Sequence, residues 1–148
     1  MSTVGYNQPV SSRRLYQVGA ERRETIVEAL ARALAEDVRV FYGYVHGSFV
    51  EGRAFHDIDV AVSLASGGTS PTDVLLDLSE SLSTRLGLPV DVRALDEAPL
   101  AFRFHALRGR LLFSRNDERL AAAIEETARR YLDLEPILRV ATREAFAS

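Results

Sequence analysis

The chain has 148 residues, and all 18 of its basic residues are arginine because the sequence contains no lysine. The absence of lysine excludes Walker-type phosphate loops, protein kinases and Schiff-base enzymes, which all need a lysine amine. Cysteine is also absent, so thiol nucleophiles, disulfides and thiolate metal sites are excluded. A net charge of −3 argues against direct nucleic-acid binding by bulk electrostatics. The sequence shows no apolar run long enough for a membrane helix and no signal peptide, so we expect a cytoplasmic protein without membrane contact.

The first half of the chain contains one predicted helix and two predicted strands. Residues 1–13 are polar, with Gly, Pro and Ser, and are expected to form a flexible N-terminal arm. Apolar spacing predicts a helix over 24–36, whereas β-branched and aromatic residues predict strands over 39–46 and 57–63. The connection between those strands is too short for a βαβ crossover. We therefore expect the strands to be antiparallel, or to be joined through one helical turn.

The second half is predicted to alternate between helices and strands. The predicted elements are a helix that starts at Ser70-Pro71 and ends at Gly87, a strand over 88–95, a helix capped by Asp96 and stopped by Gly109, a short strand over 111–114, and a helical region from 116 onward. Pro136 removes a backbone donor and crowds the carbonyl of Leu132, which predicts a kink or a new helix. This order indicates an α+β fold in which a small mixed sheet is backed by helices.

Two short motifs meet between residues 44 and 62. A predicted strand ends in Gly47-Ser48, and the next strand opens with Asp57-Ile58-Asp59. Residues two apart on a strand point to the same face, so Asp57 and Asp59 can share a hard cation or flank two. Gly47 permits a tight turn whose amides, together with the Ser48 hydroxyl, can hold a phosphate. Taken singly, an ordinary turn and a solvent-facing pair of acids explain these residues as well.

Asp91 lies in the middle of the third predicted strand, where an acid is locally disfavoured. If this strand pairs beside residues 57–63, Asp91 joins the other two acids as a third metal ligand or as the base for an attacking hydroxyl. The alternative is an edge-strand acid that is paired with Arg93 or Arg53.

The three histidines match no zinc-binding spacing. His105 is interpreted as a structural residue on a helix face. His56 directly precedes Asp57, and a place near bound phosphates stays open for it.

Gly47-Ser48, the short linker, Asp57-Ile58-Asp59 and the later strand residue Asp91 together resemble the minimal nucleotidyltransferase family of the DNA polymerase β superfamily. The resemblance extends from about residue 24 to the final helices. It implies a polymerase β-like nucleotidyltransferase fold formed by a single domain over 14–148, with a catalytic core over about 24–114 and a C-terminal helical region over 116–148.

The resemblance also implies the roles of six residues. The catalytic and Mg²⁺-binding residues would be Asp57, Asp59 and Asp91, and the nucleotide-binding residues would be Gly47, Ser48 and Arg53. Two Mg²⁺ ions are expected, with ATP as the substrate. The reaction would be in-line attack of an acceptor hydroxyl on the α-phosphorus, with release of pyrophosphate.

Stand-alone proteins of this kind resemble antitoxins that transfer AMP from ATP to a tyrosine of a HEPN-domain toxin. The resemblance therefore implies a protein adenylyltransferase that acts as an antitoxin on a small helical HEPN partner, in a homo- or hetero-oligomer. One alternative is a catalytically weak or inactive module that neutralises or scaffolds its partner by binding alone; the short linker and Glu51 motivate it. Another is transfer to a small molecule such as an aminoglycoside, for which the region after Ser114 is short.

Overall fold

The computed structural model describes residues 14–68 and 70–147, so the arm expected over 1–13 lies outside the described residues. Each helix and strand predicted from the sequence is present, with bounds that differ by a few residues. The elements are α2 (Ala20–Ala35), β1 (Val40–His46), β2 (Ile58–Leu64), α3 (Pro71–Leu86), β3 (Val90–Ala94), α4 (Leu100–Leu107), β4 (Arg110–Ser114) and α5 (Asp117–Ala147).

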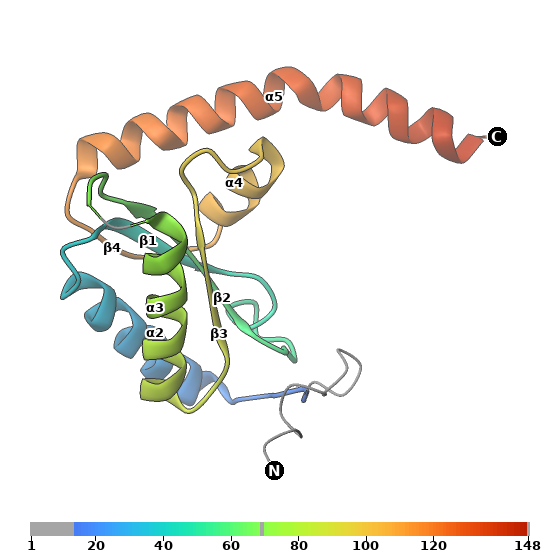
Figure 1. Cartoon of the computed structure of the whole chain (residues 1–148). Coiled ribbons are helices and arrows are strands. Elements are labelled where there is room, and N and C mark those ends of the chain that lie inside the picture. The colour runs from blue at the N-terminus through green and yellow to red at the C-terminus, as the bar shows by residue number, and fades with distance from the viewer. Residues whose placement is uncertain (1–13, 69, 148) are drawn as a thin grey trace, which may run out of the picture.

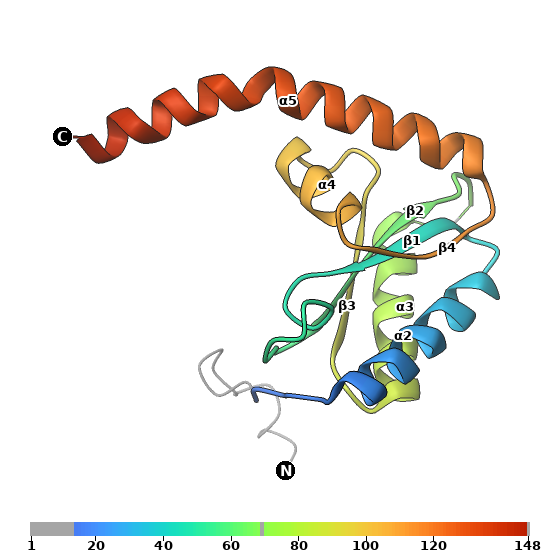
Figure 2. The ribbon, with the colours of Figure 1, turned by 180° about the vertical axis from the view of Figure 1, so that it is seen from behind.

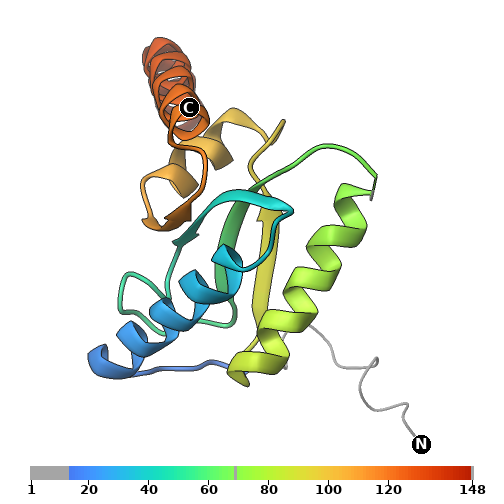
Figure 3. The ribbon, with the colours of Figure 1, turned by 90° about the vertical axis from the view of Figure 1, so that its left-hand side faces the viewer.

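The four strands form one mixed sheet in the order β3-β2-β1-β4. β1 is antiparallel to both β2 and β4, as expected from its short connection to β2, whereas β2 and β3 are parallel. Parallel neighbours need a crossover, and α3 provides it between β2 and β3. Helices α2 and α3 cover one face of the sheet, and α4 and α5 cover the other (Figures 1 and 3). The α+β architecture predicted from the sequence is confirmed.

The main core lies between the sheet and helices α2 and α3. Leu30 and Leu34 of α2 and Val45 and Val60 of the central strands are fully buried there. A smaller cluster lies on the opposite face, under α4 and α5, and contains Tyr42, Tyr44, Ala61, Leu95, Ala106 and Leu120. Successive residues of a strand point to opposite faces of the sheet and so contribute to the two clusters in turn. Both faces of the sheet are therefore covered by helices.

The edge strand β3 is protected by two serines of α3. The amide of Val90 donates a hydrogen bond to Ser83 Oγ (2.9 Å), and the amide of Val92 donates one to Ser79 Oγ (3.0 Å). Unpaired amides on a sheet edge invite pairing with another chain. The serine hydroxyls satisfy these two amides from within the domain.

Helix α5 is a single helix of 31 residues that includes Pro136. The expectation of a new helix at Pro136 is therefore wrong, because one proline removes a single ladder hydrogen bond and can bend a helix without ending it. The helix arches along its length, passes over α4 and projects beyond the domain (Figures 1 and 2). None of the helices in the described part of the chain combines the length and apolar character of a membrane span.

Candidate active site

The connection between β1 and β2 begins with a tight turn at Gly47. Gly47 has φ +85°, a backbone conformation that strongly favours glycine. The amide of Glu51 then donates to the carbonyl of Gly47 (3.2 Å), and the amide of Arg53 donates to the carbonyl of Ser48 (3.0 Å). Of the two sequence expectations for this connection, antiparallel strands are confirmed, and residues 48–52 between them form hydrogen-bonded turns.

Aromatic residues fix this connection to the rest of the domain. Phe49 and Phe55 are almost completely buried, and their rings meet edge to face with centroids 5.1 Å apart. Tyr16 and Phe55 exchange two backbone hydrogen bonds of 2.8 and 3.0 Å, and His56 Nδ1 lies 2.8 Å from the carbonyl oxygen of Arg14. The chain is therefore anchored both before and after the turn, which places Asp57 directly ahead of β2.

Strand register brings two of the predicted acids side by side. Asp59 is the partner of Asp91 across β2 and β3, and of His46 across β1 and β2. Paired residues on neighbouring strands share a face and lie about 5 Å apart. The next residue of β2, Val60, points into the main core, so Asp59, Asp91 and His46 lie on the face that carries α4 and α5. Asp57 lies one residue before the strand.

The carboxylate of Asp59 occupies the space beside Gly47. A Cβ atom built on Gly47 would lie 2.6 Å from Asp59 Oδ2, which is shorter than any normal contact. The Gly-Ser motif and the Asp-x-Asp motif thus meet in space, at the end of β1.

Asp91 has the neighbours that each of the two interpretations of the sequence expected. It lies on an edge strand and accepts a hydrogen bond from Arg93 Nε at 3.1 Å, and it also lies beside Asp59. Arg53, the third predicted nucleotide-binding residue, forms an exposed ion pair with Glu51.

His46, which the sequence offered only as one of three histidines without zinc-binding spacing, lies beside Asp59. Its ring meets Phe102 of α4 edge to face, with centroids 5.6 Å apart. Burial lowers the pKa of His46, and the nearby cation of Arg93 lowers it further, whereas Asp91 acts in the opposite direction. A lowered pKa keeps the imidazole neutral near pH 7. The sequence around His46 did not show that it would lie beside Asp59, since that contact depends on strand register.

A cavity of about 520 Å³ opens next to Gly47, between the end of β1 and the turn from α4 to β4. Its lining includes His46, Gly47, Glu51, His105, Arg108 and Gly109. Gly109 packs closely on β1, because a Cβ atom there would collide with the carbonyl oxygen of Val45. In the sequence Gly109 was only a helix stop, and nothing marked Arg108.

The donor set fits Mg²⁺ held jointly with a substrate. Within residues 14–68 and 70–147, no three acidic or histidine side chains gather closely enough to hold a metal ion by themselves. Mg²⁺ is usually bound through one or two carboxylates together with substrate phosphates and waters. Asp59 and Asp91, which are partners across β2 and β3, offer such a pair, and Asp57 lies one residue before β2.

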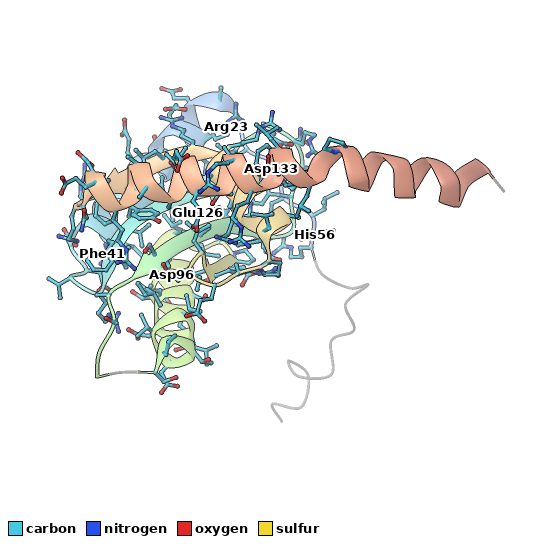
Figure 4. The ribbon with its side chains drawn as sticks, turned by 90° about the horizontal axis from the view of Figure 1, so that it is seen from above. Arg23, Phe41, His56, Asp96, Glu126 and Asp133 are labelled. Carbon is cyan, nitrogen blue, oxygen red and sulfur yellow. The ribbon has the colours of Figure 1, made fainter. Side chains whose placement is uncertain are left out.

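Figure 4 shows the domain from above, with α5 in front. Phe41 and Asp96 lie near the first turns of α5, whereas His56 lies at the other end of the domain, toward which α5 runs. Asp57, the next residue after His56, therefore lies toward that same end of the domain.

Comparison with known proteins gives a family match and a set of similar structures. The sequence model of the family described as polymerase beta, nucleotidyltransferase, matches residues 28–118. No curated protein sequence matches the chain.

Several of the similar solved structures are toxin–antitoxin structures. One is a tri-AMPylated HEPN toxin with its MNT antitoxin from Shewanella oneidensis, with 20% identity, a TM-score of 0.60, and coverage of 84% of this chain and 95% of that one. A toxin–antitoxin structure with AMP-PNP has 22% identity, a TM-score of 0.59, and coverage of 84% and 94%. A third is the MntA–HepT toxin–antitoxin pair, with 20% identity, a TM-score of 0.56, and coverage of 86% and 95%. At these identities the similarity establishes a shared fold.

Proposed function

Because the chain belongs to the polymerase β nucleotidyltransferase family, we propose that it is a Mg²⁺-dependent nucleotidyltransferase. Its substrate is ATP, its acceptor is a tyrosine hydroxyl of a HEPN-type toxin, and it acts as the antitoxin of that partner. The observation that carries this proposal is the register of β1, β2 and β3, which sets Asp59 between Asp91 and the Gly47 turn.

The proposal gives each of these residues a role. Asp57 and Asp59 bind Mg²⁺, which would neutralise charge on the phosphates of the substrate. The Gly47–Ser48 turn holds the phosphate tail through backbone amides and the Ser48 hydroxyl. Asp91 accepts the proton of the acceptor hydroxyl. The acceptor oxygen bonds to the α-phosphorus, the bond from that phosphorus to the bridging oxygen breaks, and pyrophosphate leaves with the bonding electrons.

The partner assignment is supported by the similar structures and by α5. One of those structures contains a tri-AMPylated HEPN toxin in complex with its MNT antitoxin. In this chain α5 projects beyond the domain on the same side as the connection between β1 and β2 (Figures 1 and 2). A protein bound along α5 would therefore lie close to the catalytic end.

The test is incubation of the full chain with Mg²⁺, α-labelled ATP and the candidate HEPN partner. We expect label on a tyrosine of the partner, and we expect Asp59→Asn to abolish transfer while circular dichroism stays unchanged. Glu80→Gln, a change of an exposed acid on α3, is the control and retains transfer. Full activity in Asp59→Asn would show that the site is assigned wrongly.

A second candidate function is neutralisation of the partner by binding alone. The observation that favours it is Glu51, which lines the cavity beside Gly47 and holds Arg53 in an ion pair. In the enzyme, Arg53 would have to leave Glu51 to reach a phosphate. A stable complex that inhibits the partner without any label transfer, in both the native chain and Asp59→Asn, would support this function.

A further inference from the structure

The cavity beside Gly47 lies on the opposite side of Asp59 from Asp91. Across the sheet the order is Asp91 on β3, Asp59 on β2, the His46–Gly47 end of β1, and then the start of β4. The inference that follows rests on the proposed function. In an in-line displacement the attacking and leaving oxygens lie on opposite sides of the phosphorus. If Asp91 receives the acceptor, the leaving group points toward β1 and the cavity.

The cationic side chains around the cavity differ in whether an acid already holds them. Arg110 forms two hydrogen bonds with the carboxylate of Glu24, at 2.6 and 2.9 Å. Arg53 is paired with Glu51. Arg108 also lines the cavity, and within the described part of the chain it forms no ion pair. Its cation is therefore available to an anion that enters the cavity.

Arg108 is held by an aromatic stack and not by an acid. Its guanidinium carbon lies 5.5 Å from the centre of the Phe104 ring. That ring is stacked on Tyr131 of α5, with centroids 3.9 Å apart and planes within 9°. A guanidinium on an aromatic face keeps its donors and its charge. The stack therefore orients Arg108 without neutralising it.

We propose that this cavity binds the β- and γ-phosphates of the nucleotide, and then pyrophosphate, through Arg108, and that Phe104 and Tyr131 are positioning residues for its guanidinium. A guanidinium presents two parallel donors to phosphate oxygens, which makes it suited to this ligand. A nucleobase fits this cavity less well, because one face of the Phe104 ring, on which a base could stack, is already covered by Tyr131.

The experiment measures the binding of Mg²⁺–pyrophosphate, ATP and AMP to the full chain by titration calorimetry. We expect Arg108→Ala to weaken the binding of pyrophosphate and of ATP by about tenfold or more, with the affinity for AMP unchanged. Arg108→Lys should restore only part of the lost affinity. Tyr131→Ala should lower the affinity for pyrophosphate by a smaller factor. Arg129→Ala is the control, since Arg129 lies on the exposed face of α5 beside Glu125, and it should bind all three ligands as the native chain does.

Three results would overturn the inference. The first is that Arg108→Ala and the native chain bind pyrophosphate with equal affinity. The second is that Arg108→Ala loses as much affinity for AMP as for ATP. The third is that the native chain does not bind pyrophosphate. A lower melting temperature with unchanged affinities would likewise show that Arg108 serves only the end of α4. Binding is measured without an acceptor, so failure of transfer to the partner overturns the proposed function without altering this outcome.

Discussion

The carboxylate of Asp59 occupies the position that a side chain on Gly47 would need. A Cβ atom on Gly47 would lie 2.6 Å from Asp59 Oδ2, and the backbone of Gly47 has φ +85°. Gly47, which turns the chain after β1, and Asp59, near the start of β2, therefore pack directly against each other.

We expect Gly47→Ala to reduce nucleotidyl transfer by about 100-fold or more, because a misplaced reacting group has effects of this size. It should also lower the free energy of unfolding by about 1–3 kcal/mol through backbone strain. A labelled transfer assay and urea unfolding measure the two effects.

Gly68→Ala is the matched control for this change. Gly68 also has a positive φ of +78°, but among the described residues no atom lies within 4 Å of its Cβ position. It should therefore lose some stability and keep full transfer activity. Equal loss of transfer in both variants would contradict the steric explanation.

Asp91 and its ion-pair partner should differ in their effect on the reaction. Asp91→Asn removes the proposed base, and we expect kcat to fall by about 10²–10⁴-fold. Arg93→Ala removes only the hydrogen bond to Asp91 Oδ2 and leaves the carboxylate in place, so we expect less than about a tenfold change, as for an exposed ion pair. Steady-state kinetics with saturating ATP separates the two. Similar losses of kcat in both variants would mean that the ion pair, and not the base, is what the reaction needs.

The ion pair between Asp37 and Arg39 should make stability depend on pH. Arg39 donates to both oxygens of Asp37, at 2.9 and 2.7 Å, and these hydrogen bonds hold the pKa of Asp37 below its ordinary value. A carboxylate whose pKa is lowered by folding adds stability above its unfolded pKa of about 3.9 and loses it as the pH falls through its folded pKa.

We therefore expect Asp37→Asn to lower the free energy of unfolding by about 1 kcal/mol at pH 7. The difference from the native chain should shrink below about pH 4. Urea unfolding at several pH values tests this, with Asp133→Asn as a control on the exposed face of α5. A difference that is constant between pH 7 and pH 2.5 would count against the ion pair as its source.

The serines that cover the β3 edge should matter for both stability and association. We expect the double change Ser79→Ala and Ser83→Ala to lower the free energy of unfolding by about 1–3 kcal/mol, because two edge amides lose their acceptors. Light scattering should also show more aggregation. Ser81→Ala alters an exposed serine of the same helix and should change neither measurement. Unchanged stability in the double variant would show that water replaces the hydroxyls.

Much of the fold followed from local patterns in the chain. The spacing of apolar residues predicted the correct type, helix or strand, for each element. The small number of residues between Gly47 and Asp57 predicted that β1 and β2 are antiparallel. At Pro136 a local rule predicted a kink or a new helix, and the new helix is wrong because α5 continues through that residue. Such a rule describes one lost hydrogen bond, whereas a helix of this length keeps many others.

The sequence by itself determined which chemistry is open to this protein. Without lysine or cysteine, and with Gly47-Ser48 ahead of Asp57 and Asp59, it indicated phosphate and metal chemistry on carboxylates. Only the tertiary structure decided that Asp91 lies beside Asp59, that His46 flanks the same acid, and that Arg108 faces the cavity next to Gly47. The physical reason is that periodicity reports which face a residue takes within its own element. Register between strands and the packing of α4 depend on contacts between residues that are far apart in the chain.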